Sequence, residues 1–366
     1  MGTREVWDGS GFVYPADVHR IAALREAQGF DGRNFGDAQN RYGDPYVAMG
    51  TAAQVTRTLQ MGTGVTNPVT RHPAVTAGAI GSVQVASGGR AVLGLARGDS
   101  ALAHIGMSPA PLTAFEAYLR ALQGYLAGEE VPFALADAAM GGRRADLRAS
   151  TELHAGRMPT SSRMQWLPGD VPKVPVDVYA TGPRVIRIGA RTADRVTFAV
   201  GGDPDRVRWA VGVARRAREE AGLDPDGVSY GAMVAVGIDD DLDRARRRIA
   251  GVVATTTRFS FLHDNPVGPV DDADLEVFRR VRDSYDMLRH SVTTSDQASV
   301  IPDGFMDRHA IVGPGAVCVE RMQELYAAGV DRLVLLFHGM DPEDQSEVDE
   351  AYARFAAEVI PAIRAA

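Results

Sequence analysis

Short apolar runs alternate along the whole chain with segments that have the periodicity of amphipathic helices, and this alternation restricts the fold more than any other feature. Eight β-branched or apolar runs are expected to be strands: residues 4–7, 32–36, 59–66, 90–97, 174–180, 195–200, 228–236 and 332–337. Helical patterns occupy residues 16–28, 45–57, 73–86, 112–127, 183–192, 205–221, 242–257, 271–289, 314–328 and 344–363. Strand followed by helix, repeated in this way, is typical of parallel βαβ units.

Parallel βαβ units of this kind can form either of two folds: a doubly wound open sheet or a (β/α)8 TIM barrel. The open dinucleotide-binding sheet would place a G-x-G-x-x-G run directly after its first strand, and residues 8–13 contain none. Eight units with glycine-rich, polar residues after several strands favour the barrel. We therefore predict an α/β chain whose 366 residues form one barrel domain, with insertions at about residues 131–173 and 263–274. These stretches account for the excess over about 250 residues.

The charged residues exclude several classes of function. The chain has 39 basic and 47 acidic residues and a formal net charge of −8, and Lys173 is its single lysine. A Schiff-base mechanism would depend on Lys173, which precedes the fifth strand, at the end away from the expected active-site mouth. No G-x-x-x-x-G-K-[ST] phosphate loop is present. An acidic chain without a dense basic run argues against nucleic-acid binding.

Cysteine content and hydropathy bear on location. Cys318 is the single cysteine, so the chain has no intrachain disulfide framework, which fits a reducing compartment. Glu5 and Asp8 interrupt the place where a secretory signal would have its apolar core. No apolar run of about 18 residues is present that would span a bilayer. We expect a cytoplasmic protein with no membrane partner.

In a barrel, the functional residues lie where strands meet the loops at their C-terminal ends. These positions are rich in glycines and small hydroxyls, and the eight histidines form no metal-binding cluster. Such residues suit a flat ring and a phosphate, which the backbone must approach closely. The segments concerned are residues 37–40, 64–68 with Arg71 and His72, 97–100, 181–183, 201–203 and 338–339.

Several of these residues have two interpretations. Thr181, Gly182 and Pro183 begin a predicted helix, so they form either an anion site at its N-terminus or ordinary turn and cap chemistry. Asp99 either orients a substrate or caps the next helix. His72 and His338 are the histidines nearest the mouth, and each is either a proton donor or a structural hydrogen-bonding group. Arg97, like Arg71, is a candidate for binding an anionic substrate or phosphate.

Two sequence blocks carry a family resemblance: residues 62–73 (GTGVTNPVTRHP) and 87–99 (SGGRAVLGLARGD). They resemble the bacterial luciferase-like superfamily, and within it methylenetetrahydromethanopterin reductase and its bacterial relatives. The resemblance continues through residues 174–183, 311–314 and 329–333, and so covers nearly the whole chain. It implies a (β/α)8 barrel that binds either FMN or the deazaflavin coenzyme F420.

The resemblance also assigns roles to residues. It implies a cis peptide bond between Gly64 and Val65 that forms a bulge against the cofactor ring. Thr66 and Asn67 would line the ring, and Asp37 would lie near it. By the same matching, the turn formed by Thr181, Gly182 and Pro183 would receive the cofactor's phosphate.

The chain departs from the family at one position. Many deazaflavin-dependent relatives have a histidine after the aspartate at the end of the second strand, where this chain has Ala38. The missing imidazole removes a proton carrier and places FMN ahead of F420. Gln39 and Asn40 remain as groups for binding substrate or a ring edge.

Together these features predict a flavin-dependent oxidoreductase of the luciferase-like class that acts on a small organic substrate. The favoured mechanism is a two-component monooxygenase that uses O2 and reduced FMN from a separate flavin reductase. The alternatives are F420-dependent hydride transfer without oxygen and a flavin-binding protein without catalytic activity. The superfamily resemblance further suggests a homodimer.

Overall fold

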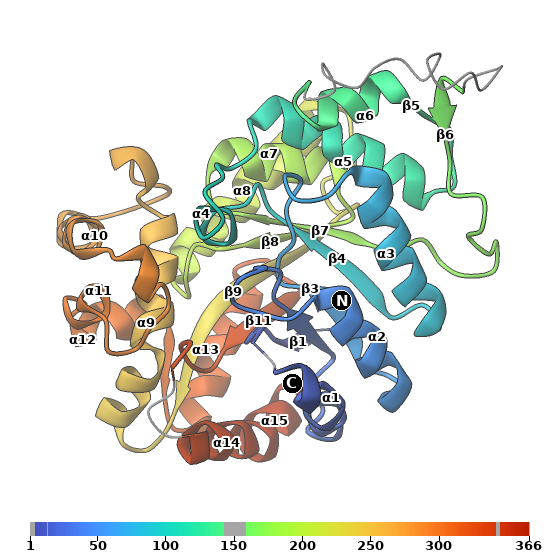
Figure 1. Ribbon diagram of the computed structural model, residues 1–366. Helices are drawn as coiled ribbons and strands as arrows, with labels where there is room; N and C mark the ends of the chain where they lie inside the picture. The colour runs from blue at the N-terminus through green and yellow to red at the C-terminus, as the bar shows by residue number, and fades with distance from the viewer. Residues whose placement is uncertain (1–3, 13, 143–158, 342–344, 366) are drawn as a thin grey trace.

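Eight parallel strands form a closed ring at the centre of the molecule (Figure 1), in a computed structural model that describes residues 4–12, 14–142, 159–341 and 345–365. Each strand pairs in parallel with the next, and β11 pairs with β1 to complete the ring. The predicted (β/α)8 barrel is confirmed. Its strands are β1 (Glu5–Asp8), β2 (Gly32–Phe35), β3 (Gln60–Thr63), β4 (Ala91–Leu95), β7 (Val176–Ala180), β8 (Arg195–Phe198), β9 (Ser229–Ile238) and β11 (Arg332–Leu336).

Side chains alternate between the inside of the ring and the surrounding helices, as the two-residue period of a strand requires. Trp7 is buried inside with Val92 and Val334, and a separate, larger apolar cluster fills the space outside the ring. Gly32 makes room for the indole, because a Cβ there would lie 2.4 Å from Cε2 of Trp7. The barrel interior is therefore packed with side chains and leaves the strand ends for function.

Helices cover the ring on the outside, and several begin where the sequence indicates (Figure 1). Pro73 and Pro183 stand at the first position of α3 and α7, where the missing N–H costs nothing. The Asp203 side chain caps α8 by accepting from two backbone N–H groups. The helices are α1 (Val18–Ala27), α2 (Pro45–Val55), α3 (Pro73–Ala86), α5 (Leu112–Leu126), α7 (Pro183–Thr192), α8 (Pro204–Glu220), α13 (Gly315–Ala327), α14 (Gln345–Arg354) and α15 (Ile360–Ala365).

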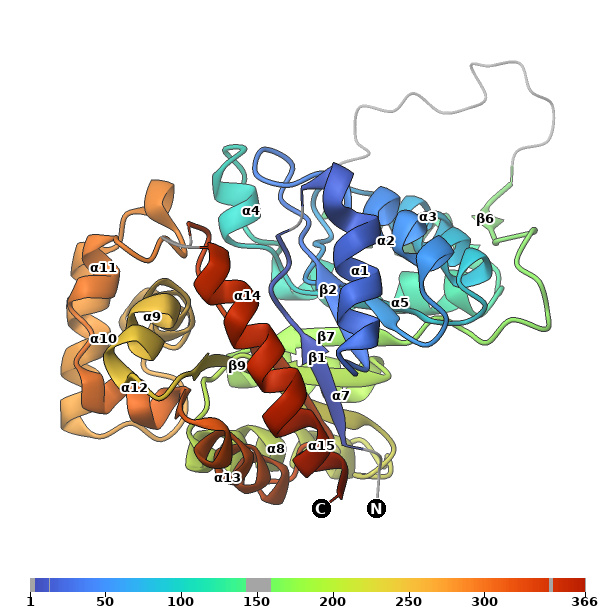
Figure 2. The same ribbon diagram turned by 90° about the horizontal axis from the view of Figure 1, so that it is seen from below.

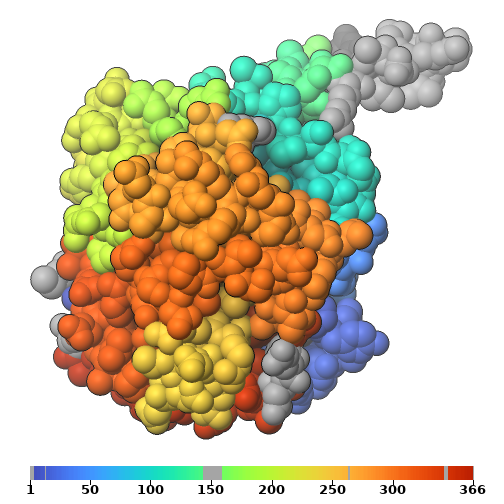
Figure 3. All heavy atoms as spheres, turned by 90° about the vertical axis from the view of Figure 1, so that its left-hand side faces the viewer, coloured from blue at the N-terminus to red at the C-terminus, as the bar shows by residue number. Residues whose placement is uncertain are grey.

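The longest connection, between β9 and β11, forms a helical subassembly beside the barrel (Figure 2) and covers the face seen in Figure 3. We call it the crossover. It has its own apolar cluster, which includes Phe261, Phe278 and Phe305. Its elements before α13 are α9 (Leu242–Phe259), the short helices η4 (Leu262–Asp264) and η5 (Met287–Arg289), α10 (Asp272–Ser284), α11 (Asp296–Ser299), α12 (Asp303–His309) and the strand β10 (Ile311–Gly313).

The elements predicted from the sequence agree less well with the structure in the crossover and in the other proposed insertion than in the ring. The helix predicted over residues 271–289 is divided into α10 and η5, and the irregular stretch 263–274 contains most of η4 and the start of α10. In the other proposed insertion, 131–173, the structure has the hairpin strands β5 (Val131–Pro132) and β6 (Ser161–Ser162) and helix α6 (Phe133–Ala139). Residues 143–158 of that stretch lie outside the described residues. A short helix, α4 (Ser100–Ala103), follows β4.

No helix among the described residues combines the length and the apolar character that a membrane crossing needs.

Candidate active site

The segment that follows β3 crosses the mouth of the barrel and contains a cis peptide bond between Gly64 and Val65, as the family resemblance implies. The N–H of Gly64 donates to the carbonyl of Phe35 at 2.7 Å, and the N–H of Thr66 donates to the carbonyl of Gly94 at 3.0 Å. The backbone of Gly64 also lies close to β2, because a Cβ added to Gly64 would be only 2.5 Å from the Cβ of Asn34 in that strand. The segment is therefore held to both neighbouring strands and pressed against the barrel interior.

Asp37, which follows β2, is the buried centre of a polar group that we call the Asp37 cluster: Asp37, Gln39, Thr66 and Arg71. Its carboxylate accepts from Thr66 Oγ1 at 2.6 Å and from Gln39 Nε2 at 2.7 Å, and it pairs with the Arg71 guanidinium. Asp37 is 4% exposed. Because both carboxylate oxygens are engaged, Asp37 positions Thr66 and Arg71, as an acceptor-only group does. Asp37 and Thr66, which the family resemblance places at the cofactor ring, are thus in direct contact with each other.

Asn67 has a side-chain donor that finds no partner in the part of the chain that the structure describes. Its Oδ1 accepts from the N–H groups of Val69 and Thr70 at 2.9 and 3.1 Å, which fixes the orientation of the amide. Its Nδ2 is buried and has no hydrogen-bond partner among the described residues. Buried polar atoms are nearly always hydrogen-bonded, so an orphaned donor at the mouth of a barrel indicates a site for a ligand's acceptor atom.

A second part of the site lies at the N-terminus of α7. Gly182 is the N-cap, no side chain caps the helix, and a Cβ there would meet nothing within 4 Å. Thr181 Oγ1 donates to the carbonyl of Ala199 at 3.3 Å. Burial lowers the pKa of Arg97, and the nearby charge of Arg184 lowers it further. Neither arginine pairs with a carboxylate among the described residues, so this helix start combines free N–H groups with two uncompensated cations, as an anion site requires.

Asp99 does not cap α4, because its side chain makes no capping hydrogen bond. The capping interpretation of Asp99 is therefore wrong. Instead its carboxylate forms an ion pair with Arg258 from the end of α9, with Arg258 Nη2 at 3.2 Å from Oδ1. Arg258 could not be recognised as a partner from local sequence patterns, because 159 residues separate it from Asp99.

The two candidate histidines occupy different environments. His72 is the N-cap of α3, where its Nδ1 accepts from the N–H of Ala74 at 3.2 Å. His338 has Nδ1 2.6 Å from the carbonyl oxygen of Gly339. Burial lowers the pKa of His338 to about 4, so the ring is neutral near pH 7 and Nδ1 carries the donated proton. Nε2 of His338 is then an acceptor, which does not suit a proton donor.

The two candidate substrate amides are both engaged. Gln39 bonds to Asp37, and Asn40 Nδ2 donates to the carbonyl of His104 at 3.2 Å. Five mouth residues that sequence reasoning missed come from the loop after β2, the loop after β4 and two parts of the crossover: Arg41, His104, Arg258, Tyr285 and His290. Only the closed ring brings these segments together.

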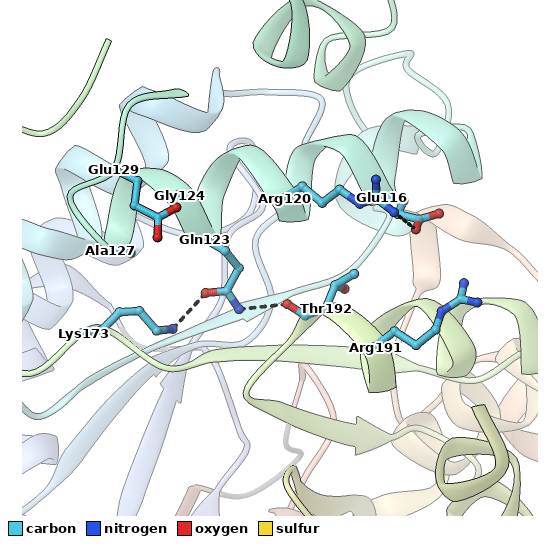
Figure 4. Close-up of a pocket in the computed structure, with 9 residues that line it drawn as sticks. All are labelled: Glu116, Arg120, Gln123, Gly124, Ala127, Glu129, Lys173, Arg191 and Thr192. Atoms are coloured by element: carbon cyan, nitrogen blue, oxygen red, sulfur yellow. Dashed lines mark hydrogen bonds and ion pairs between the residues drawn. The ribbon is translucent and has the colours of Figure 1, made fainter. Parts of the chain in front are cut away.

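A separate pocket lies between α5 and α7, next to Lys173 (Figure 4). Lys173 Nζ lies 2.7 Å from Oδ2 of Asp194 and 2.8 Å from Oε1 of Gln123. Gln123 Nε2 in turn donates to the carbonyl of Thr192 at 2.9 Å. Lys173 precedes β7, so this pocket is at the opposite end of the barrel from the strand ends that carry function.

Comparison with known proteins gives the family. Residues 3–332 match the luciferase-like monooxygenase family. The chain is 31% identical over 322 residues to 5,10-methylenetetrahydromethanopterin reductase of Methanolobus tindarius, covering 87% of this chain and 89% of the relative. The chain therefore belongs to the luciferase-like family, and we describe it as an oxidoreductase of that family.

Solved structures show the same fold. The coenzyme F420-dependent tetrahydromethanopterin reductase of Methanopyrus kandleri is similar with a TM-score of 0.72 and 20% identity, over 99% of each chain. An F420-dependent secondary alcohol dehydrogenase, in complex with an F420–acetone adduct, is similar with a TM-score of 0.72 and 16% identity, over 100% of each chain.

Proposed function

We propose that this protein transfers a hydride between coenzyme F420 and a carbon atom of a small organic substrate. The observation that carries the proposal is the buried, unpartnered Nδ2 of Asn67 beside the Asp37 cluster, which fits an acceptor atom on a flat ring. F420 is supported by two structures of the same fold that are F420-dependent and by the relative that is a 5,10-methylenetetrahydromethanopterin reductase, the enzyme class of the first of these structures.

The residues at the mouth fit such a cofactor in two places. Asn67 would bind an acceptor atom of the ring, and the Asp37 cluster would hold Thr66 and the cis segment in place below it. The start of α7, with Arg97 and Arg184, would bind the phosphate. When bound, the cofactor supplies the hydride chemistry, while the protein supplies position, orientation and exclusion of water.

The second candidate function is the two-component monooxygenase, which would use O2 and reduced FMN delivered by a separate reductase. It is supported by the family description and by Ala38, a buried methyl group where many deazaflavin-dependent relatives have a histidine. The ring-binding and phosphate-binding residues would be the same, so the two functions differ in cofactor and oxidant.

The test is a comparison of two reactions with the purified protein. Under anaerobic conditions, reduced F420 is mixed with methylenetetrahydromethanopterin, methylenetetrahydrofolate and a panel of ketones, and its oxidation is followed by absorbance. In air, oxygen uptake is measured with reduced FMN and the same panel. We expect substrate-dependent oxidation of reduced F420. The proposal would be contradicted by substrate-dependent oxygen uptake with reduced FMN and no substrate-dependent oxidation of reduced F420. Binding of either cofactor without turnover of any substrate would favour a non-catalytic protein.

We also propose that the protein forms a homodimer through α2 and α3, which lie side by side (Figure 1). Neither helix contains a charged residue, although 23% of the chain is charged. Val47 and Val75 on these helices are 68% and 59% exposed. An uncharged face with exposed valines fits an apolar partner surface, and a second copy supplies one.

Glutamate at both valines should separate the subunits, because the interface would then bury four unpaired carboxylates. We expect the native protein to sediment as a dimer at micromolar concentration and the Val47→Glu, Val75→Glu double variant to sediment as a folded monomer. The matched control, Leu288→Glu, changes a residue that is 80% exposed on the crossover and should leave the dimer intact. A monomeric native protein, or a double variant that remains dimeric, would refute this interface.

A further inference from the structure

The loop after α10 forms a wall of the barrel mouth. The carbonyl of His290 accepts from Arg41 Nη2, in the loop after β2, at 3.2 Å. The carbonyl of Ser291 accepts from the N–H of Met340, in the loop after β11, at 2.8 Å. Arg258, at the end of α9, pairs with Asp99 after β4. The crossover is therefore joined to three of the strand-end loops, and its residues here face the same mouth as the Asp37 cluster.

The cations of this mouth differ in how they are neutralised. Arg71 pairs with Asp37 and with Asp44, and Arg258 pairs with Asp99. Arg41 has no carboxylate partner within the described part of the chain. Its two hydrogen bonds go to neutral acceptors: Nη1 to His104 Nε2 and Nη2 to the carbonyl of His290, both at 3.2 Å.

The neighbouring rings do not supply the missing negative charge. A guanidinium has only donors, so Nε2 of His104 is the acceptor of this hydrogen bond and carries no negative charge. His290 Nδ1 lies 2.6 Å from the hydroxyl of Tyr285. Burial lowers the pKa of His290 to about 3, and the charges of Arg41 and Arg258 lower it further against the opposing effect of Asp99. Burial also raises the pKa of Tyr285, so at neutral pH both rings are uncharged.

Arg41 therefore carries the net positive charge of this wall. Arg41 is half-buried. It lies in a turn that directly follows Asp37, where its backbone N–H donates to the carbonyl of Ala38 at 2.8 Å. The exposed amide of Asn40 lies beside it, bonded to the carbonyl of His104. A half-buried cation without a carboxylate partner among the described residues, beside a side-chain amide, has the composition of an oxyanion site.

We infer that Arg41, with the side-chain amide of Asn40 beside it, binds an oxyanion on the organic substrate, a carboxylate or a phosphate, which replaces His104 Nε2 as an acceptor of the guanidinium. This inference rests on the proposed function, because it assigns the organic substrate to the wall that the loop after β2 forms with the crossover. The substrate would then be anionic at one end, with its reacting carbon toward Asn67 and the Asp37 cluster.

The experiment needs neither cofactor nor turnover, so its result is independent of the proposed reaction. The protein is labelled at histidine Cε1 with 13C, the His104 signal is assigned with His104→Gln, and the apo protein is titrated with benzoate, acetate or inorganic phosphate. We expect saturable shifts of the His104 signal with at least one of these anions. In Arg41→Gln the affinity should fall by about tenfold or more, as for the loss of a hydrogen bond to a charged group, and Arg41→Lys should restore part of it.

Arg97→Gln is the matched control, because it removes an uncompensated arginine at the start of α7. It should leave the His104 response to all three anions unchanged. A response to carboxylates alone identifies a carboxylate substrate, and a response to phosphate alone identifies a phosphate. Absence of any shift in the native protein, or equal shifts in native protein and folded Arg41→Gln, would overturn the inference.

Discussion

Replacing Gly94 by alanine is expected to lower the free energy of unfolding by about 3 kcal/mol, near the upper end for overpacked cores. A Cβ on Gly94 would lie 2.0 Å from the carbonyl oxygen of Thr63, which is backbone and has no rotamer to change. The Gly94 carbonyl also accepts from Thr66 N–H and, at 2.7 Å, from Thr63 Oγ1. The substitution therefore pushes β3 and β4 apart directly below the cis segment. The midpoint of urea unfolding measures the effect.

Gly304 provides the control for this substitution. It lies in α12, and a Cβ there would meet nothing within 4 Å. Gly304→Ala should leave stability unchanged or raise it by up to about 1 kcal/mol, since alanine favours a helix. If Gly94→Ala unfolds at the same urea concentration as the native protein, the close contact between β3 and β4 is not as described.

Replacing Asp37 by alanine is expected to have the largest effect on the site. It leaves the half-buried Arg71 without its main counter-charge and Thr66 without its acceptor. Removing one partner of a buried ion pair costs about 3–5 kcal/mol, and partial exposure of Arg71 places our expectation near 3. Because Thr66 and Asn67 would lose their fixed position, cofactor affinity should fall by about tenfold, roughly the value of one hydrogen bond, as a second consequence of the same change. Urea unfolding and a cofactor titration measure the two effects.

Asp44→Asn is the matched control, because Asp44 also pairs with Arg71, at 3.0 Å, but is exposed. Asparagine can still cap α2 in place of this aspartate. The loss of an exposed ion pair should cost less than about 1 kcal/mol and leave cofactor affinity unchanged. Equal effects of the two variants would mean that Asp37 is one surface charge among others rather than the centre of the cluster.

The barrel could be predicted from sequence because its determinants are local. Runs such as Leu333–Phe337 are buried on both faces and so read as central strands, and Pro73 and Pro183 mark the starts of α3 and α7. The short elements α11, α12 and β10 were missed because they are stabilised by packing within the crossover and have too few residues to show a period.

The candidate site also has a part that could be predicted from the sequence and a part that could not. Asp37, Gly64, Thr66 and Asn67 follow neighbouring strands, so the fold and the family resemblance bring them together. The hydrogen-bond partners were not predictable: Asp99 meets Arg258, and His290 meets Arg41, across 159 and 249 residues. No local pattern encodes such pairs, because each depends on how the crossover packs against the strand-end loops. The preference for FMN rested on Ala38 alone, and the structures of the same fold include both F420-dependent proteins and monooxygenases.

The most direct test of the central proposal is an anaerobic binding titration of the native protein and its Asn67→Asp variant with F420 and with FMN. Asparagine and aspartate have the same shape, and aspartate keeps the acceptor for Val69 and Thr70 but replaces the unpartnered donor with an acceptor. We predict that F420 binds the native protein about tenfold more tightly than FMN, and that Asn67→Asp weakens F420 binding by about tenfold or more. Tighter binding of FMN, or an Asn67→Asp variant that binds F420 as the native protein does, would contradict the proposal.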